Sequence, residues 1–188
     1  MSGNSDFKLD RRVPKPFQVP GSGKLCVDFD TSMGRISCRL LESRTPVTVW
    51  NFAEVLCGKL IGKPYLDGLT FHRVVPEFLI HGGCPNGDGT GGPGHSVPHE
   101  EDVTNHHDRG GLLTQFYVNR DTGGSQFMIT EEPAPWLDRN HTIFGEVVEG
   151  MDVVKKIARV PSDKKNRPLK PIVIEKAVLY RGRRQEEC

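Results

Sequence analysis

Apolar residues recur along this chain in short runs that are bounded by glycine, proline, asparagine or charged residues. Short runs rich in β-branched and aromatic residues predict strands rather than helices. A turn at 32–34 separates the first two runs. We expect strands at 25–31, 35–40, 70–75, 78–82, 111–118, 126–130, 143–148 and 172–180.

Two segments change to the helical period. Residues 46–57 place apolar side chains at i, i+3, i+4 and i+7, with Thr45 at a capping position and Gly58 after the last turn. Residues 151–158 predict a second amphipathic helix. The two apolar stripes consist of Val49, Phe52, Ala53 and Leu56, and of Met151, Val154 and Ile157 or Ala158. Many short strands and two separated helices argue against a doubly wound parallel sheet. They predict a closed antiparallel barrel with helices over its open ends.

The chain of 188 residues is long enough for one domain with a full core. Residues 1–23 contain several prolines and glycines, few apolar residues and no period, which predicts an extended N-terminal arm. The domain is expected at 24–181, followed by a charged C-terminal tail at 182–188.

The charge balance of the chain narrows the possible partners. The chain has 25 Lys and Arg against 24 Asp and Glu, so its charge gives no reason to expect nucleic acid or a membrane surface as partner. We expect a cytoplasmic protein, with the nucleus as an alternative location, because no apolar run resembles a signal peptide or membrane span. We also expect a monomer.

The five cysteines are expected to be reduced and mostly buried. Cys26 and Cys38 lie on the two strands of the predicted hairpin and could face each other, and the sequence leaves open whether they bond.

Several motifs offer chemistry that their context does not support. The segment GDGTGG at 87–92 matches a dinucleotide-binding string, but Pro93 and Pro98 prevent the helix that such a site needs. Histidines are dense between His81 and His107, yet solvated loop histidines explain them better than zinc does, because no paired cysteines accompany them. No nucleophile elbow or carboxylate pair is present. We therefore expect no cofactor and no metal.

Four blocks occur in a characteristic order: FHRVVPEFLIHGG, GDGTGG, GGSQFMIT and WLDRNHTIFGEVVEGMDVV. Together they resemble the cyclophilins, the peptidyl-prolyl cis–trans isomerases, from about Lys24 to Arg181. The resemblance implies an eight-stranded antiparallel barrel capped by two α-helices. It also implies rotation about X-Pro bonds in proline-containing peptides and unfolded protein segments, in support of protein folding.

The resemblance extends to the residues of the substrate groove. The arginine that this family uses to stabilise the twisted amide corresponds to Arg73, which alternates with Phe71 and Val75 on one strand face. His72 lies beside it, with a structural and a functional role equally open. The matching residues are Arg73 and Gln126 at catalytic positions, Phe78, Leu79, Met128, Leu137 and His141 around the proline, and Trp136 on the rim.

The sequence departs from the family at the groove floor. His81 replaces a common glutamine, and Phe116, Tyr117 and Val118 replace a common Ala-Asn-Ala. An imidazole with an ordinary pKa would make peptide binding depend on pH between about 5.5 and 7.5. The bulky side chains are expected to narrow the groove and to weaken binding of cyclosporin, a macrocycle that many cyclophilins bind there. Two functions remain. The first, favoured by the intact Arg73 and Gln126, is an active isomerase that assists protein folding and whose rate the replacements could reduce. The alternative is a proline-binding module with weak or no turnover within a larger assembly.

Overall fold

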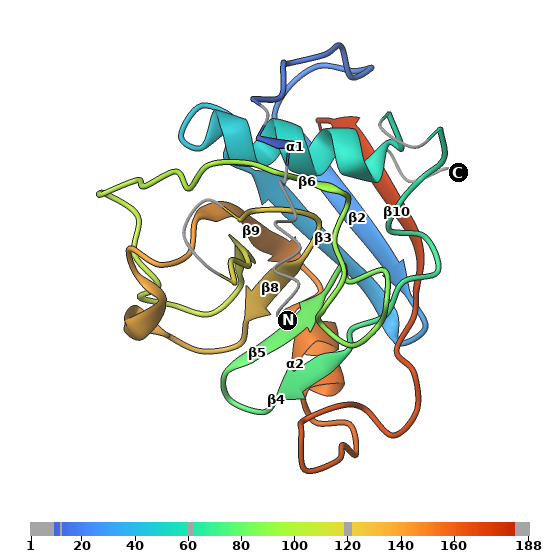
Figure 1. Ribbon diagram of the computed structural model, residues 1–188. Helices are drawn as coiled ribbons and strands as arrows, with labels where there is room; N and C mark the ends of the chain where they lie inside the picture. The colour runs from blue at the N-terminus through green and yellow to red at the C-terminus, as the bar shows by residue number, and fades with distance from the viewer. Residues whose placement is uncertain (1–9, 12, 60–61, 119–121, 183–188) are drawn as a thin grey trace, which may run out of the picture.

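The fold is built on one eight-stranded antiparallel sheet, in the order β10-β2-β3-β9-β7-β8-β5-β4 (Figure 1). The computed structural model describes residues 10–11, 13–59, 62–118 and 122–182. The strands are β2 (Leu25–Thr31), β3 (Gly34–Leu40), β4 (Arg73–Val75), β5 (Leu79–Gly82), β7 (Leu112–Gln115), β8 (Phe127–Thr130), β9 (Ile143–Glu149) and β10 (Ile174–Arg181). All eight predicted strands are confirmed, most of them shorter at their ends than the apolar pattern suggested.

The sheet curls until its two edge strands, β10 and β4, approach each other. The chain that enters β4 completes the curl, because Thr70 forms a bridge with Val173. Next to this bridge, the Phe71 amide donates to the Ile172 carbonyl at 3.0 Å. These bonds satisfy edge groups that would otherwise face water or another chain. The predicted antiparallel barrel is thereby confirmed.

Helix α1 (Pro46–Leu56) and helix α2 (Met151–Ala158) cover opposite ends of the curled sheet (Figure 1). Helix α1 packs on β9 and β10, and α2 packs on β3, β4 and β5. Thr45 occupies the predicted N-cap position of α1, but its hydroxyl makes no capping bond and donates to the Ile143 carbonyl at 3.3 Å. The Glu100 carboxylate, from a distant loop, instead accepts bonds from the Val47 and Thr48 amides at 3.0 and 2.6 Å. No helix in the described part of the chain is long and apolar enough to cross a membrane.

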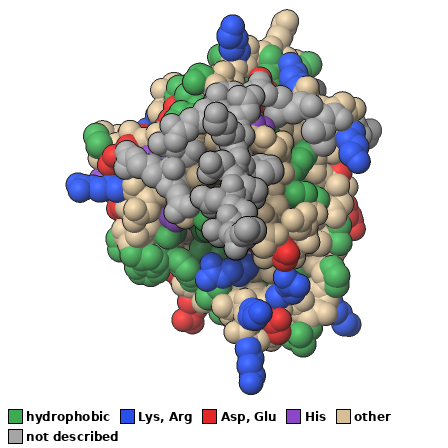
Figure 2. Space-filling model, viewed as in Figure 1, with side chains coloured by type: hydrophobic (Ala, Val, Ile, Leu, Met, Phe, Trp, Pro, Cys, Tyr) green, Lys and Arg blue, Asp and Glu red, His purple; other side chains and the backbone are tan. Residues whose placement is uncertain are grey.

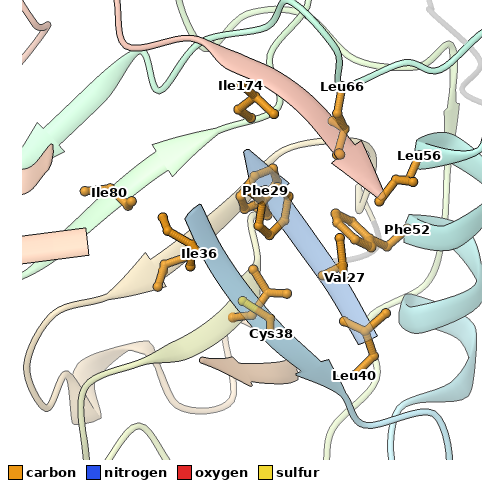
Figure 3. Close-up of a cluster of buried hydrophobic side chains, with 14 of the residues drawn as sticks. Val27, Phe29, Ile36, Cys38, Leu40, Phe52, Leu56, Leu66, Ile80 and Ile174 are labelled. Carbon is orange, nitrogen blue, oxygen red and sulfur yellow. The ribbon is translucent and has the colours of Figure 1, made fainter. Parts of the chain in front are cut away.

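The main core fills the space between the curled sheet and α1 (Figure 3). Phe29 of β2 and Phe127 of β8 stack with ring centroids 5.1 Å apart, and Phe52 of α1 meets Phe127 edge-on at 5.8 Å. All three are at most 1% exposed. Burial of one such ring contributes about 1.5–3 kcal/mol, so residues from three distant segments hold this end of the barrel together.

The N-terminal chain lies against the domain where it is described. Strand β1 (Asp10–Arg11) pairs in parallel with β6 (His95–Ser96), a two-stranded addition that the apolar pattern did not indicate. Farther on, the Phe17 ring meets Trp50 of α1 edge-on at 5.2 Å, and Val19 is buried. The boundary at residue 23 and the tail after 182 stay predictions, since residues 1–9 and 183–188 lie outside the described residues.

Cys26 and Cys38 are not bonded to each other. The β2–β3 register explains this, because Cys38 lies opposite Val27 whereas Cys26 lies opposite Arg39. Consecutive side chains in a strand point to opposite faces, so a one-residue offset separates the two thiols. Burial raises the pKa of both thiols, which therefore stay protonated and unreactive.

Candidate active site

Strand register explains how charged and imidazole groups share strands with core residues. Arg73 of β4 lies opposite His81 of β5, and His81 lies opposite Met128 of β8. Cross-strand partners point to the same face, so these three side chains form one row on the outer side of the sheet. The neighbouring row, Val74, Ile80, Ile129 and Leu113, points the other way and belongs to the main core.

A small apolar cluster lies on the outer side of the same strands. It is formed by Leu79, Met128, Ala134 and Leu137, with Phe78 and Phe116 packed against it. The 3₁₀ turn η1 (Pro135–Leu137) buries Leu137 but leaves Trp136 63% exposed, with its ring 5.4 Å from that of Phe78. The fold therefore brings together five side chains that the family resemblance assigned to the proline pocket and its rim: Phe78, Leu79, Met128, Trp136 and Leu137.

Phe116 stands in the middle of the groove. Its ring centroid is 4.4 Å from that of His81 on one side and 5.8 Å from that of His141 on the other. Of its two neighbours, Tyr117 is turned inward, where its hydroxyl lies 2.9 Å from the Thr142 hydroxyl. Val118 is 70% exposed. Phe116 is therefore the bulky replacement that narrows the groove, and Tyr117 lies beneath it.

Gln126 fixes a wall of the groove. Its side-chain amide donates to the carbonyls of Gly89 and Gly91 at 2.9 and 2.8 Å. The same two residues donate their amides to the Cys84 sulfur at 3.2 and 3.3 Å. The GDGTGG segment is thus a pinned loop beside the groove and opens no helix that could receive a pyrophosphate. Within the described residues the Gln126 Oε1 atom is buried without a hydrogen-bond partner.

His81 is buried, with only 3% of the residue exposed. Burial lowers its pKa to about 3, assisted by the positive charge of Arg73 and by His72, whose ring is 4.4 Å away. Burial also lowers the pKa of His72 and of His141. The expectation that His81 titrates between pH 5.5 and 7.5 is therefore wrong: desolvation keeps the ring neutral throughout that range.

Two pockets adjoin the groove and meet at Phe116, which lines both. The first, of about 540 Å³, lies along the GDGTGG loop and is bounded by Gln126. The second, of about 620 Å³, lies beside Arg73 and His81 and is lined on one side by residues of the segment 163–167. The resemblance to the cyclophilin motifs did not point to this segment, although its run of cationic residues (DKKNR) is visible in the sequence.

Electron-pair donors in the described residues do not gather into a metal site. No group of three or more His, Cys, Asp or Glu side chains in that part of the chain lies close enough together to hold an ion. His107, near the groove, is instead fully engaged: its Nδ1 lies 2.7 Å from Asp138 Oδ1 and its Nε2 lies 3.1 Å from the Thr114 hydroxyl.

The fold has counterparts among solved structures. A cyclophilin-type peptidyl-prolyl cis–trans isomerase of Cryptosporidium parvum superposes with a TM-score of 0.79 at 28% identity, covering 85% of this chain and 99% of that one. A second structure of that protein, in the presence of the dipeptide Ala-Pro, gives a TM-score of 0.76 at 30% identity, covering 84% and 99%.

Sequence comparison points the same way. A peptidyl-prolyl cis–trans isomerase of Schizosaccharomyces pombe is 41% identical over 155 residues, covering 81% of this chain and 97% of its own. Peptidyl-prolyl cis–trans isomerase B of Bacillus subtilis is 43% identical over 124 residues, covering 66% and 83%. The family described as cyclophilin type peptidyl-prolyl cis–trans isomerase matches residues 26–179. The chain therefore belongs to the cyclophilin-type peptidyl-prolyl cis–trans isomerases.

Proposed function

We propose that the groove on the outer face of β4, β5 and β8 is where this isomerase binds proline-containing peptides and unfolded segments. Rotation about a peptide bond is slow because double-bond character must be lost, which costs about 18–20 kcal/mol. The two X-Pro isomers differ by only about 0.5–1 kcal/mol, so the enzyme changes a rate rather than an equilibrium. A site that stabilises the twisted amide is sufficient for this task.

Arg73 carries the proposal. Its side chain is half-buried beside the apolar cluster, and within the described residues it has no ion pair and no side-chain hydrogen bond. The prolyl nitrogen becomes a hydrogen-bond acceptor only when resonance is broken in the twisted state. A guanidinium held nearby therefore stabilises the transition state more than the ground state. Its planar shape and permanent charge suit it to this role better than lysine.

The apolar cluster supplies the complementary hold on the proline ring. Leu79 and Met128 are at most 2% exposed, and Phe116 packs against them. We expect the Phe116 ring to swing aside, or to serve as one wall, when a proline enters. The Cryptosporidium parvum structure in the presence of Ala-Pro supports a proline ligand on this fold.

Gln126 acts in this proposal as a positioning residue. Its amide holds the loop at Gly89 and Gly91, and its remaining oxygen is an unused acceptor facing the groove floor. The relatives reported above are named isomerases, which supports turnover and lends no support to a binding module without it.

Arg73→Ala tests the proposal directly. Removal of one transition-state donor typically costs up to about 10³-fold, so we expect kcat/KM on a short X-Pro peptide, measured by exchange NMR, to fall at least about tenfold. Arg35→Ala, which removes an equally charged side chain from β3 on another part of the sheet, should retain activity. Thermal unfolding should be unchanged for Arg73→Ala. A folded Arg73→Ala variant with wild-type kcat/KM would refute this role of the groove.

A further inference from the structure

The pocket beside Arg73 is strongly basic. Its lining includes four cationic side chains, Arg73, Lys164, Lys165 and Arg167, and two acidic ones, Asp88 and Asp163. Four positive and two negative charges leave a formal charge of +2 in a chain whose total is +1. Figure 2 shows Lys and Arg side chains gathered low on this face, over the loop that follows α2 in Figure 1.

The two acidic groups are already engaged by the backbone. Asp163 Oδ1 accepts bonds from the amides of Lys165 and Arg167 at 2.7 and 2.9 Å. Asp88 Oδ1 accepts bonds from the amide and hydroxyl of Thr90 at 2.9 and 2.6 Å. These bonds lower the pKa of both carboxyl groups. Neither carboxylate lies within ion-pair distance of a cation of the pocket among the described residues, although Arg167 is near enough to contribute to the lowered pKa of both.

The cationic loop is positioned by backbone hydrogen bonds and by the Asp163 carboxylate, and not by its cationic side chains. The amides of Asp163 and Asn166 bond to the carbonyls of Arg167 and Asp163, both at 2.9 Å. The Asn166 carbonyl accepts the Val74 amide at 2.8 Å, which ties the loop to β4 beside Arg73. Lys164, Lys165 and Arg167 are exposed, so their charges can be removed while these bonds remain.

Two buried imidazoles face the same pocket with unused nitrogens. His81 is 3% exposed, and neither of its ring nitrogens makes a well-formed hydrogen bond among the described residues; the nearby Gln126 side chain only partly offsets the lowering of its pKa by burial. His72 is 7% exposed, and its Nδ1 likewise makes no well-formed hydrogen bond there, although the Thr70 backbone partly offsets the lowering of its pKa by burial. An unmade hydrogen bond in a buried position is costly, and a neutral imidazole satisfies an oxyanion by donating its N–H. A metal cation would meet the repulsion of four positive side chains.

We infer that this pocket binds an oxyanion, a carboxylate or phosphate carried by a side chain of the substrate within a few residues of its proline. The inference rests on the proposed function of the groove, because Arg73 belongs to both the groove and the pocket. The cations attract the anionic side chain, and the N–H groups of His72 and His81 receive it in a partly dehydrated setting. The enzyme thereby prefers X-Pro bonds in acidic or phosphorylated segments.

Matched peptides test this preference. Glutamate or phosphoserine is placed at each of three positions on either side of Ala-Pro, with glutamine or serine as the neutral counterpart. Two or three exposed charge contacts together give about five- to twentyfold, so we expect kcat/KM to rise by that factor for at least one anionic position. The gain should shrink toward 1 M salt, where the screening length falls to about 3 Å.

A variant that lacks the cationic side chains of the segment 163–167 tests whether these charges cause the preference. The triple variant Lys164→Ala, Lys165→Ala, Arg167→Ala should lose the preference for anionic peptides and keep wild-type kcat/KM on the neutral ones. The double variant Lys170→Ala, Lys176→Ala removes exposed charge outside the pocket and should keep the preference. Equal kcat/KM for anionic and neutral peptides at every position would overturn the inference, as would a preference that survives in the triple variant.

Two further arms separate related explanations. Inorganic phosphate that shifts the His72 and His81 NMR signals, without any peptide preference, would assign the pocket to a free anion and overturn the inference about substrates. If wild-type protein turns over no peptide, the proposed function fails. Calorimetric binding of the anionic peptides to wild-type and triple-variant protein then still decides the inference, which requires tighter binding by the wild type.

Discussion

Two buried imidazoles in this molecule have opposite surroundings. His107 is 1% exposed, and both of its ring nitrogens meet partners, Asp138 and Thr114. His81 is 3% exposed, and neither of its ring nitrogens has a partner in the described chain. Burial lowers the pKa of both rings, so burial and pKa alone do not separate them. Hydrogen bonding does: a satisfied imidazole holds the fold, and an unsatisfied one beside a pocket is available to a ligand.

The largest effect on stability is expected from removing His107, the fully hydrogen-bonded imidazole. His107→Ala leaves a cavity and a buried Thr114 hydroxyl without its partner, so we expect the free energy of unfolding to fall by about 2–4 kcal/mol. Chemical denaturation measures this change. His106→Ala is the matched control, because His106 also contacts Asp138, at 3.2 Å, but has a 59% exposed side chain. It should cost less than about 0.5 kcal/mol, and an equal loss in both variants would contradict the comparison.

Cyclosporin affinity tests whether the Phe116 ring, which lies over His81, obstructs the groove. Phe116 packs over His81, so Phe116→Ala should strengthen cyclosporin binding by about 1–3 kcal/mol, a factor of roughly 5–150 in Kd. Tyr117→Phe should leave Kd unchanged, because the Tyr117 ring lies beneath the groove. Calorimetric titration measures both variants. Tight binding by the unmodified protein would show that Phe116 is no obstacle.

The smallest effect should come from replacing His81 itself. His81→Gln removes no hydrogen bond, so stability at pH 7 should change by less than about 1 kcal/mol. Because burial lowers the folded-state pKa of His81 to about 3, the unfolded chain binds the extra proton below about pH 6.5. Wild-type stability therefore falls with acid between those two values, by up to about 1.4 kcal/mol per pH unit from this group.

Measurement at pH 7 and pH 5 isolates that contribution. His81→Gln should lose up to about 2 kcal/mol less than wild type between the two values. The isomerase activity of both proteins should show no His81-dependent step between pH 6.5 and 8, where the ring is neutral. A step in wild-type activity near pH 6.5 that disappears in His81→Gln would mean that the ring is solvated when peptide is bound.

The sequence predicted more of the fold than of the site's interior. Period-2 alternation placed Arg73 and Val75 on one face of β4, as strand geometry requires. Phe71, which was expected on the same face, precedes the strand and belongs to the main core. The ordered family motifs pointed to Phe78, Leu79, Met128 and Leu137, which the fold gathers into one apolar cluster; their contact with a proline stays a prediction. The helix periodicity of 46–57 and the N-cap position of Thr45 were correct. The capping bonds come instead from Glu100, which lies in a loop that no local pattern links to α1.

By itself, the sequence determined the mainly β architecture, the two helices and the residues available for the groove, because these depend on local periodicity and on motifs in chain order. Tertiary structure alone decided that Phe116 stands in the groove while Tyr117 turns inward. It also set the segment 163–167 beside Arg73, about ninety positions earlier in the chain. Tertiary structure also decides the protonation state of His81, because its pKa depends on how completely distant segments exclude water from the ring.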